Sequence, residues 1–311
     1  MGGILMLAII VFMNLSQGSA QAILRPTQDS LPRLIALEPT GVRRQVTPTR
    51  ISPTVTAEPP HRYVEIPVSS TPTPLTISNK HQAEIIGYSA EGRPLELYTF
   101  GKGVHERMIV AGIHGGDEWN TVTLANQLIK YMDQNSEVIP DDMTLYVLPN
   151  LNPDGEARAH NKYGRVNDNG VDLNRNFPVN WQKDWDRSGC WNTLSTSGGM
   201  GPGSEFETQS LINFVDTHNL EALISYHSAA LGVFPGGLPW EADSIRLAKS
   251  IAEVSTYPFP PIDTGCTYSG TLADYAVSKG IAAVDLELTN HFDTDFDQNL
   301  DILNVLLNFV P

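Results

Sequence analysis

Two histidines and a glutamate occupy positions from which their side chains could converge on one metal ion. His114 follows an apolar run, and Glu118 comes four residues later, after two glycines. His227 follows a second apolar run. Imidazole nitrogens and a carboxylate are ligands of catalytic zinc, which keeps a fourth position open. Only two cysteines are present, which excludes a closed four-thiolate zinc site. Taken singly, either histidine also fits a hydrogen-bonded residue at the edge of the core.

A long polar segment between these residues favours the metal site. It reads Arg-Val-Asn-Asp-Asn-Gly-Val-Asp-Leu-Asn-Arg-Asn-Phe-Pro over residues 165–178. Shorter pieces precede and follow it: Ser-Ala-Glu-Gly-Arg-Pro at 89–94, Asn-Pro-Asp-Gly at 152–155 and Ser-Glu-Phe-Glu-Thr at 204–208. In this order, the pieces strongly resemble the M14 family of zinc carboxypeptidases. The resemblance covers roughly residues 83–310.

The resemblance implies that one zinc ion per chain is held by His114, Glu118 and His227. The usual family spacing is His-x-x-Glu, whereas here three residues separate His114 from Glu118 and Asp117 stands at the usual place. We favour Glu118, because Trp119 and the expected start of a helix align with it, and we treat the second glycine as an insertion. Asp117 is the alternative ligand.

The resemblance also assigns the residues that handle the substrate. Asn174 and Arg175 match the pair that binds the terminal carboxylate, Arg165 matches the arginine that polarises the scissile carbonyl, and Glu287 matches the general base. A guanidinium can donate two parallel hydrogen bonds to a carboxylate. Because zinc lowers the pKa of its water towards about 7, a neighbouring glutamate can take the proton and deliver it to the leaving nitrogen. Asp285, on the same strand face as Glu287, is the competing base.

Further pocket residues follow from the same comparison. Tyr268 matches the tyrosine that closes over the substrate, although it lies nearer to the following glycine than is usual. Ala273 is expected to line the specificity pocket, where a small neutral residue would not favour basic side chains by charge. Cys190 and Cys266 could form a disulfide between two loops near the pocket, or remain thiols.

Short apolar runs that alternate with amphipathic stretches predict an α/β fold. We expect a mixed, largely parallel central sheet with helices on both faces, which the resemblance identifies as zinc carboxypeptidase-like (phosphorylase/hydrolase-like). The expected strands are Met108–Ile113, Thr144–Leu148, Ala222–Tyr226 and Ile281–Leu288, and the expected helices are Glu118–Met132 and Ser204–Thr217. Ser204 and Glu207 suggest a capping box at the start of the second helix.

Composition divides the chain into three parts. Residues 1–22 hold an apolar stretch followed by small residues and are expected to be a signal peptide or an N-terminal anchor. Residues 23–80 are rich in Pro and Thr, typical of a disordered linker or pro-segment. Residues 81–311 would form the peptidase domain. We therefore expect a secreted, extracellular monomer, or a protein anchored to a membrane and facing outside.

Charge argues against nucleic acid as a partner. The formal net charge is −15, whereas phosphate contacts need clustered Lys and Arg. Asp293, Asp295 and Asp297 alternate like the start of an EF-hand, but Gln298 and Asn304 replace the required Gly and Glu. A solvated acidic turn therefore fits this segment better than a calcium loop.

The expected function is zinc-dependent hydrolysis of a peptide bond beside a C-terminal carboxylate, in a peptide or muropeptide substrate. One alternative is a murein peptide amidase that cleaves γ-D-glutamyl-diaminopimelate bonds, since related branches share the zinc site and the Gly-Arg-Pro motif. Amino-acid deacylation fits the run at residues 165–178 less well. A catalytically inactive binding module is the alternative outside enzymes, and the intact base and arginines argue against it.

Overall fold

A mixed seven-stranded sheet forms the centre of the computed structural model, which describes residues 81–185, 194, 196–229, 232–263 and 265–311. Its order is β1-β2-β4-β3-β5-β7-β6. The strands are β1 (Gln82–Tyr88), β2 (Pro94–Gly101), β3 (His105–Val110), β4 (Met143–Leu148), β5 (Leu220–Ser228), β6 (Gly232–Pro235) and β7 (Ala282–Leu288). All described residues belong to one compact unit, 70–311.

The four central strands run parallel, and the edges are antiparallel. β3 pairs in parallel with β4 and β5, and β5 pairs in parallel with β7. β2 and β1 extend one side and β6 the other, all by antiparallel pairing. The expected mixed, largely parallel sheet is thus confirmed. Because parallel strands end at one edge of a sheet, the segments that follow β3, β4, β5 and β7 meet there.

Six α-helices and four short 3₁₀ turns connect the strands within the described residues. The helices are α1 (Trp119–Gln134), α2 (Pro153–Arg158), α3 (Phe206–Thr217), α4 (Ala242–Glu253), α5 (Leu272–Ser278) and α6 (Phe296–Asn308). The 3₁₀ turns are η1 (Gly115–Glu118), η2 (Ser136–Val138), η3 (Lys162–Gly164) and η4 (Leu173–Arg175). None of the described helices is long and apolar enough to cross a membrane.

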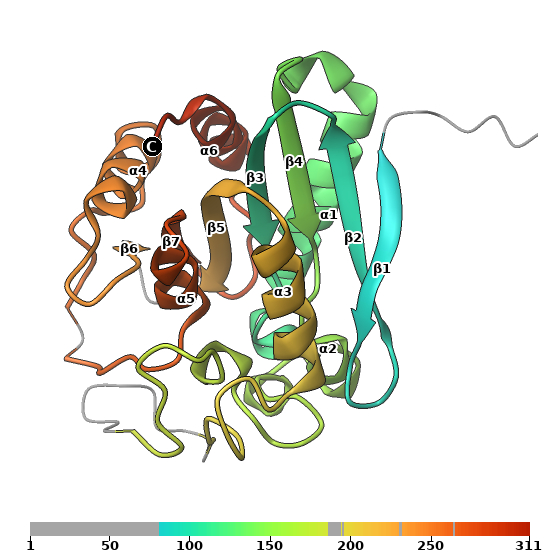
Figure 1. Cartoon of the computed structure of the whole chain (residues 1–311), viewed down its shortest axis with the longest axis vertical. Coiled ribbons are helices and arrows are strands. Elements are labelled where there is room, and N and C mark those ends of the chain that lie inside the picture. Colours follow the sequence, from blue (N-terminus) through green and yellow to red (C-terminus); the bar gives the residue numbers. More distant parts are fainter. Residues whose placement is uncertain (1–80, 186–193, 195, 230–231, 264) are drawn as a thin grey trace, which may run out of the picture. The chain divides into compact units, whose positions relative to one another are not determined.

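Alternation along the buried strands gives the sheet two apolar faces. Ile109 packs in a core cluster with the buried faces of α1, α4 and α6. Its neighbours Met108 and Val110 belong to a second cluster with α3 and α5. Figure 1 shows α1 behind the sheet and α3 in front of it. Helices therefore cover both faces, and the carboxyl edge of the central strands is left to loops.

The start of α3 differs from the expected capping box. Glu205, not Ser204, is the N-cap, and Ser204 Oγ donates to Glu205 Oε1 at 2.6 Å. Glu205 Oε2 and Glu207 Oε2 both accept hydrogen bonds from Asn167 Nδ2, at 2.8 and 3.2 Å. Glu207 also accepts from the backbone N–H of Ala90 at 3.0 Å. The two glutamates are thus engaged in holding the loop that leads to η4, and the helix begins at Phe206.

The Ser-Ala-Glu-Gly-Arg-Pro and Asn-Pro-Asp-Gly motifs meet in the structure. Asp154 accepts hydrogen bonds from Ser89 Oγ at 2.7 Å, from the Glu91 backbone N–H at 3.0 Å and from Arg93 Nη1 at 2.5 Å. The side chain of Asp154 is buried. The two motifs therefore fasten the β1–β2 turn to α2, beneath the loops at the carboxyl edge.

The acidic turn at residues 293–297 accepts hydrogen bonds from residues outside it. Asp295 Oδ2 accepts from Tyr257 Oη at 2.8 Å and from the Thr289 backbone N–H at 2.9 Å, and Asp297 lies in the first turn of α6. Asp293 Oδ2 accepts from the side chain of Asn290. These aspartates are not among the described residues that gather as metal ligands. The expected segments 1–22 and 23–80 lie outside the described residues.

Candidate active site

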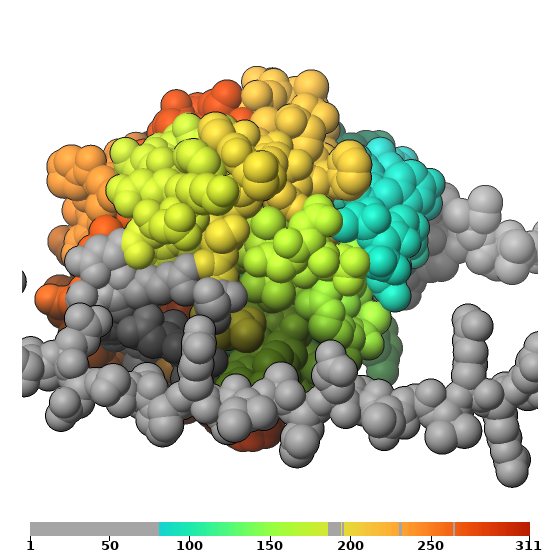
Figure 2. All heavy atoms as spheres, turned by 90° about the horizontal axis from the view of Figure 1, so that it is seen from below, coloured from blue at the N-terminus to red at the C-terminus, as the bar shows by residue number. Residues whose placement is uncertain are grey.

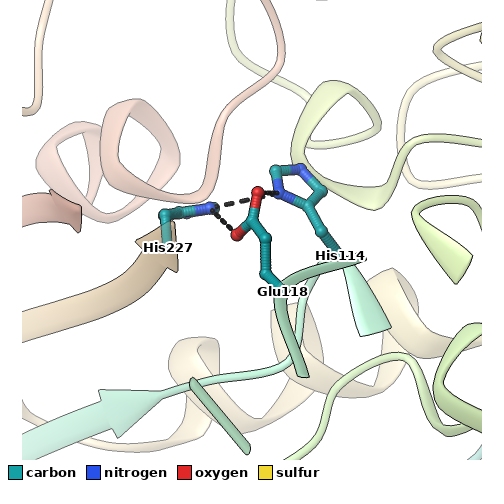
Figure 3. Close-up of side chains that lie close together, drawn as sticks. All are labelled: His114, Glu118 and His227. Carbon is teal, nitrogen blue, oxygen red and sulfur yellow. Dashed lines mark hydrogen bonds and ion pairs between the residues drawn. The ribbon is translucent and has the colours of Figure 1, made fainter. Parts of the chain in front are cut away.

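His114, Glu118 and His227 converge at the carboxyl edge of the sheet, and no more than 4% of each residue is exposed. One nitrogen or oxygen of each side chain lies within 4.8 Å of the others, in the one such ligand group that the described residues form. His114 Nδ1 is 2.7 Å from Glu118 Oε1, and His227 Nδ1 is 3.2 Å from Glu118 Oε2. Figure 3 shows the two imidazoles on either side of the carboxylate.

The two glycines shape the turn that carries His114 and Glu118. Gly115 has a φ of +47°, which L-residues with side chains rarely adopt. A Cβ on Gly116 would lie 2.1 Å from the backbone oxygen of Ala159, so the turn packs directly against the end of α2. The 3₁₀ turn brings Glu118 to the two histidines and leaves Asp117 outside the ligand group, with Oδ2 3.8 Å from Arg165 Nη1.

Asp172 fixes the outer side of His114. Its Oδ1 lies 3.2 Å from His114 Nε2, and its Oδ2 accepts a hydrogen bond from Arg165 Nε at 3.0 Å. Such a carboxylate orients a metal-ligating imidazole and raises its basicity. Arg165 also places Nη1 3.4 Å from Glu118 Oε1. Arg165 therefore lies beside the three potential ligands His114, Glu118 and His227, called the metal group below, and Asp172 holds its guanidinium in place.

His227 is oriented by three groups around its Nε2. Ser225 Oγ lies at 3.0 Å, Asn174 Nδ2 at 3.3 Å and Asp285 Oδ1 at 3.4 Å. The last of these is an ion-pair distance without hydrogen-bond geometry, because Asp285 Oδ1 has no hydrogen-bond partner among the described residues. With Nε2 occupied, Nδ1 is the nitrogen that faces Glu118.

The electrostatics of the three groups suit a cation. Burial would raise the pKa of Glu118, but His114 and His227 outweigh it and hold that pKa well below its ordinary value. Burial would lower the pKa of His227, but Asp285 and Glu118 raise it well above the ordinary value. Burial and the charge of Glu118 raise the pKa of Asp117. Carboxylates thus surround the histidines with negative charge, which a divalent cation would neutralise.

Asn174 and Arg175 lie in η4, beside the metal group. Asn174 Oδ1 accepts from the Leu272 backbone N–H at 2.8 Å, which fixes the amide. The Arg175 guanidinium contacts two aromatic rings, with its central carbon 5.3 Å from the ring centre of Trp185 and 5.4 Å from that of Tyr268. Arg175 Nε is buried without a hydrogen-bond partner among the described residues. A buried guanidinium with an unused donor is suited to an incoming carboxylate.

Glu287 reaches the site from β7. The parallel register sets Glu287 beside His227 and Asp285 beside Ser225. Paired residues of adjacent strands point to the same face, so both carboxylates lie on the face of His227. Both also line the cavity that holds the metal group. The structure therefore brings both candidate bases named from the sequence to the site.

One cavity of about 820 Å³ contains all eight predicted site residues. Its other walls come from the segments Phe234–Leu238, Pro260–Asp263 and Thr271–Asp274. Figure 2 looks onto this edge of the domain, where segments 150–185 and 196–217, in green to yellow, gather beside the cyan strands β1 and β2. The cavity volume is within the range of small-molecule and peptide sites.

Three residues of the site were not identified from the sequence. Asp172 belongs to the Asp-Leu-Asn-Arg run, and its place in that motif is the one signal that could have marked it as a site residue, whereas its contact with His114 is seen only in the structure. Ser225 lies two residues before His227, and this strand periodicity could have identified it. Trp185 carries no such signal, because its contact with Arg175 is made across a loop.

Tyr268 and Cys266 line the cavity from the same segment. The Tyr268 ring contacts Phe234, with centroids 6.1 Å apart. Cys266 is disulfide-bonded, and Cys190, the other cysteine of the chain, lies outside the described residues. A cross-link at Cys266 restrains the segment that carries Tyr268.

Comparisons with known proteins agree with this architecture. The family model described as zinc carboxypeptidase, Peptidase_M14, matches residues 76–296. Mast cell carboxypeptidase A of Rattus norvegicus is 31% identical over 231 residues, which cover 63% of this chain and 55% of that protein. Murein peptide amidase A of Escherichia coli (strain K12) is 33% identical over 152 residues, which cover 46% of this chain and 58% of that protein. The chain thus spans about half the length of these curated relatives.

Solved structures share the fold. Carboxypeptidase A from Helicoverpa armigera superposes with a TM-score of 0.58 at 19% identity, covering 73% of this chain and 68% of that structure. A murein-tripeptide amidase from Escherichia coli O157 superposes with a TM-score of 0.55 at 24% identity, covering 74% and 92%. These likenesses show the shared fold, and the family match over most of its length shows that the chain belongs to the zinc carboxypeptidase family, M14.

Proposed function

We propose that the protein is a zinc-dependent metallocarboxypeptidase that hydrolyses a peptide-type bond next to a free carboxylate. The observation that carries the proposal is one cavity that contains both the His114–Glu118–His227 group and the partly unsatisfied guanidinium of Arg175. A metal group alone would fit many hydrolases. A buried arginine beside it adds a site for the end of a chain.

The donor set fits one zinc ion. His114 Nδ1, His227 Nδ1 and the Glu118 carboxylate supply two nitrogens and one carboxylate, which leaves a position open. Asp172 and Ser225 hold the outer nitrogens of the two histidines. When bound there, zinc would act as a Lewis acid and lower the pKa of water at the open position.

Substrate binding, proton transfer and stabilisation of the carbonyl oxygen would be carried out by side chains of the protein. Arg175 and Asn174 would bind the terminal carboxylate and so place the scissile bond over the metal group. Glu287 would accept the proton of the attacking water and transfer it to the leaving nitrogen. The guanidinium of Arg165 would donate to the carbonyl oxygen as negative charge develops there. Tyr268, next to Arg175, would cover the bound residue.

The test is hydrolysis of a matched pair of N-blocked dipeptides that differ only in a free or an amidated C-terminus. We expect the zinc-loaded protein to cleave the free acid at least tenfold faster, because the amide cannot form the paired contact with Arg175. A chelator should abolish cleavage and added zinc should restore it. Equal cleavage of both peptides, or cleavage that survives removal of the metal, would contradict the proposal.

A murein peptide amidase is the second candidate for the same site. It is supported by the 33% identity to murein peptide amidase A. The mechanism would be unchanged, and the difference lies in the bond, which would join a γ-D-glutamyl group to diaminopimelate. Comparing the rates on a γ-D-glutamyl-diaminopimelate peptide and on an α-linked dipeptide distinguishes the two functions.

Export is part of the same proposal. It is supported by the apolar stretch and the small residues within residues 1–22. N-terminal sequencing of the protein recovered from outside the cytoplasm would identify a cleaved segment. Recovery of the intact chain in the cytoplasm would contradict export.

A further inference from the structure

A buried asparagine connects the first turn of α1 to the loop that follows the expected base. Asn120 is the second residue of α1, and its side chain is fully buried. Its Nδ2 donates to the backbone oxygens of Asn290 at 2.7 Å and Asp293 at 2.9 Å. Both carbonyls belong to residues 289–293, called the β7 loop below, which come directly after the strand that carries Glu287. The proposed mechanism gives Asn120 no part.

The two carbonyls fix the orientation of the Asn120 amide. A backbone carbonyl can only accept a hydrogen bond, so the atom that faces both must be the amide nitrogen, and Oδ1 is left as an acceptor. Ser228 Oγ donates to this Oδ1 at 2.9 Å. With its proton used in this way, Ser228 Oγ can only accept from His291 Nδ1, which lies 3.2 Å away. The direction of every hydrogen bond in the network is thus determined.

Ser228 joins this network to the metal group. It follows His227 at the end of β5, and its backbone N–H donates to Glu118 Oε2 at 3.1 Å. One residue therefore holds Glu118 through its backbone and Asn120 through its side chain. Glu118, Asn120 and Ser228 are all buried, so water competes little for these hydrogen bonds. A continuous path of hydrogen bonds thus runs from a predicted metal ligand to the β7 loop.

The β7 loop needs such a connection because the strand before it ends at Leu288, and sheet pairing holds the chain only to that point. The loop has hydrogen bonds of its own. The backbone N–H groups of Phe292 and Asp293 donate to Asn290 Oδ1 at 2.7 and 2.8 Å. These bonds maintain the shape of the loop but do not fix its place relative to the metal group. The side chain of Asn120 supplies that contact.

We propose that Asn120 is a positioning residue for hydrolysis, which acts through Ser228 to hold the β7 loop at a fixed place relative to the metal group. A general base must lie within hydrogen-bond reach of the proton that it takes, and a displacement of about 1 Å can cost about 100-fold in rate. Asn120 is not among the described residues that line the cavity, so it acts through its neighbours. The inference rests on the proposed function, because it assumes that Glu287 is the base and Glu118 a metal ligand.

The first test replaces Asn120 by Asp, which has the same shape but puts an oxygen where the two carbonyls need a donor. With the zinc-loaded protein and the free-acid dipeptide, we expect kcat to fall by about 10- to 100-fold. KM should change by less than about threefold, because Asn174 and Arg175 are unaltered. Asn126→Asp is the matched control, since Asn126 donates to a backbone carbonyl on the exposed side of the same helix. An unchanged kcat, or a loss confined to KM, would overturn the inference.

Ser228→Ala interrupts the same path from its other side. The variant keeps the backbone N–H that donates to Glu118 and the contacts of Asn120 with the β7 loop, but it lacks the hydroxyl between them. We expect a fall in kcat without a rise in KM, and a double variant with Asn120→Asp about as slow as the slower single variant. Losses that multiply would show that the two residues act independently and would contradict the inference. If Asn120→Asp does not fold, Ser228→Ala carries the test alone.

Hydrogen exchange tests the connection without hydrolysis and so separates this inference from the proposed function. If the zinc-loaded protein cleaves no peptide, the proposed function is wrong, and exchange still tests Asn120. In the unaltered protein we expect saturating zinc to slow exchange of the backbone amides of residues 289–293 by at least about threefold, because fixing Glu118 also restrains Ser228 and Asn120. Asn120→Asp should remove this effect, and Asn126→Asp should keep it. Equal protection by zinc in Asn120→Asp, or none in the unaltered protein, would overturn the inference.

Discussion

His114 Nε2 and Asp172 Oδ1 lie 3.2 Å apart, on the side of the imidazole away from Glu118. The same aspartate accepts a hydrogen bond from Arg165 through its other oxygen. Burial would raise the pKa of Asp172, but Arg165 and His114 hold it well below its ordinary value. One carboxylate thus positions both a predicted metal ligand and the arginine expected to assist at the carbonyl.

Replacing Asp172 by Asn should weaken zinc binding. The amide keeps the shape of the side chain but lacks the charge that orients His114, so we expect zinc affinity to fall by about 10- to 100-fold. Competition with a chromophoric chelator measures it. Asp168→Asn, in the exposed part of the same loop, is the matched control. Unchanged affinity in Asp172→Asn would show that the contact does not support the metal.

Substitution of Glu118 and of Asp117 should have different effects on metal content. Glu118→Ala removes a member of the ligand group, and we expect the purified protein to lose its zinc. Asp117→Ala should keep about one zinc ion per chain, because its carboxylate lies outside that group. Atomic absorption decides between them, and zinc retained by Glu118→Ala but lost by Asp117→Ala would reverse the assignment.

Glu287→Gln should slow catalysis without removing the metal. Glutamine cannot accept the proton of the attacking water, so kcat should fall by about 10²- to 10⁴-fold. Zinc content should stay the same because Glu287 is outside the ligand group. Glu253→Gln, exposed at the end of α4, serves as control. Full activity of Glu287→Gln would require another base.

Arg175→Lys tests recognition of the chain end. Lysine keeps the positive charge but cannot form two parallel hydrogen bonds, and it loses the contacts of the guanidinium with the rings of Trp185 and Tyr268. We expect kcat/KM for a free C-terminus to fall by about 10- to 100-fold, with less change for an amidated peptide. Arg246→Lys, in an exposed pair with Asp243, is the control. An equal loss on both peptides would point to a folding defect.

Asp154→Asn should make stability less dependent on pH. Burial would raise the pKa of Asp154, but its bonds to Ser89, Glu91 and Arg93 lower it overall. Because the pKa of Asp154 is lower in the folded than in the unfolded protein, its carboxylate stabilises the fold at pH values above the unfolded-state pKa of about 3.9. That contribution is lost as the pH falls through the pKa of the folded state.

We expect the variant to be about 1–2 kcal/mol less stable at pH 7, with a gap that narrows below about pH 4. Urea unfolding of metal-free protein at several pH values measures this difference without a contribution from zinc. Asp168→Asn again provides the control. A gap that stays constant into acid would mean that the hydrogen bonds of Asp154 stabilise the fold independently of its charge.

Much of the fold followed from local patterns. The buried runs at β3, β4, β5 and β7 and the helical spacing of α1 were predictable because each depends on residues near in sequence. Ser204 was misread because a capping box is also a local pattern, whereas the carboxylate of Glu207 is used by Asn167, which is 40 residues away. Such competition for a hydrogen bond is decided by tertiary structure.

Site residues that belong to a sequence motif could be predicted. Those that only tertiary packing brings to the site could not. His114, Arg175 and the other motif residues all line one cavity. The choice between Glu118 and Asp117 needed the geometry of the glycine turn. Ala273 suggested an uncharged pocket, whereas in the structure Asp274 and Asp285 line the same cavity as Ala273.

The pairing of His227 with Glu287 across β5 and β7 limits how this protein can be altered. A strand advances about 3.3 Å per residue, and a slip of one residue turns its side chains to the opposite face. Inserting or deleting a residue in either strand would therefore part a predicted ligand from the predicted base. Exchange of the loops that wall the cavity leaves this register unchanged. New substrate preferences can thus be engineered by grafting loops, provided that both strand lengths are preserved.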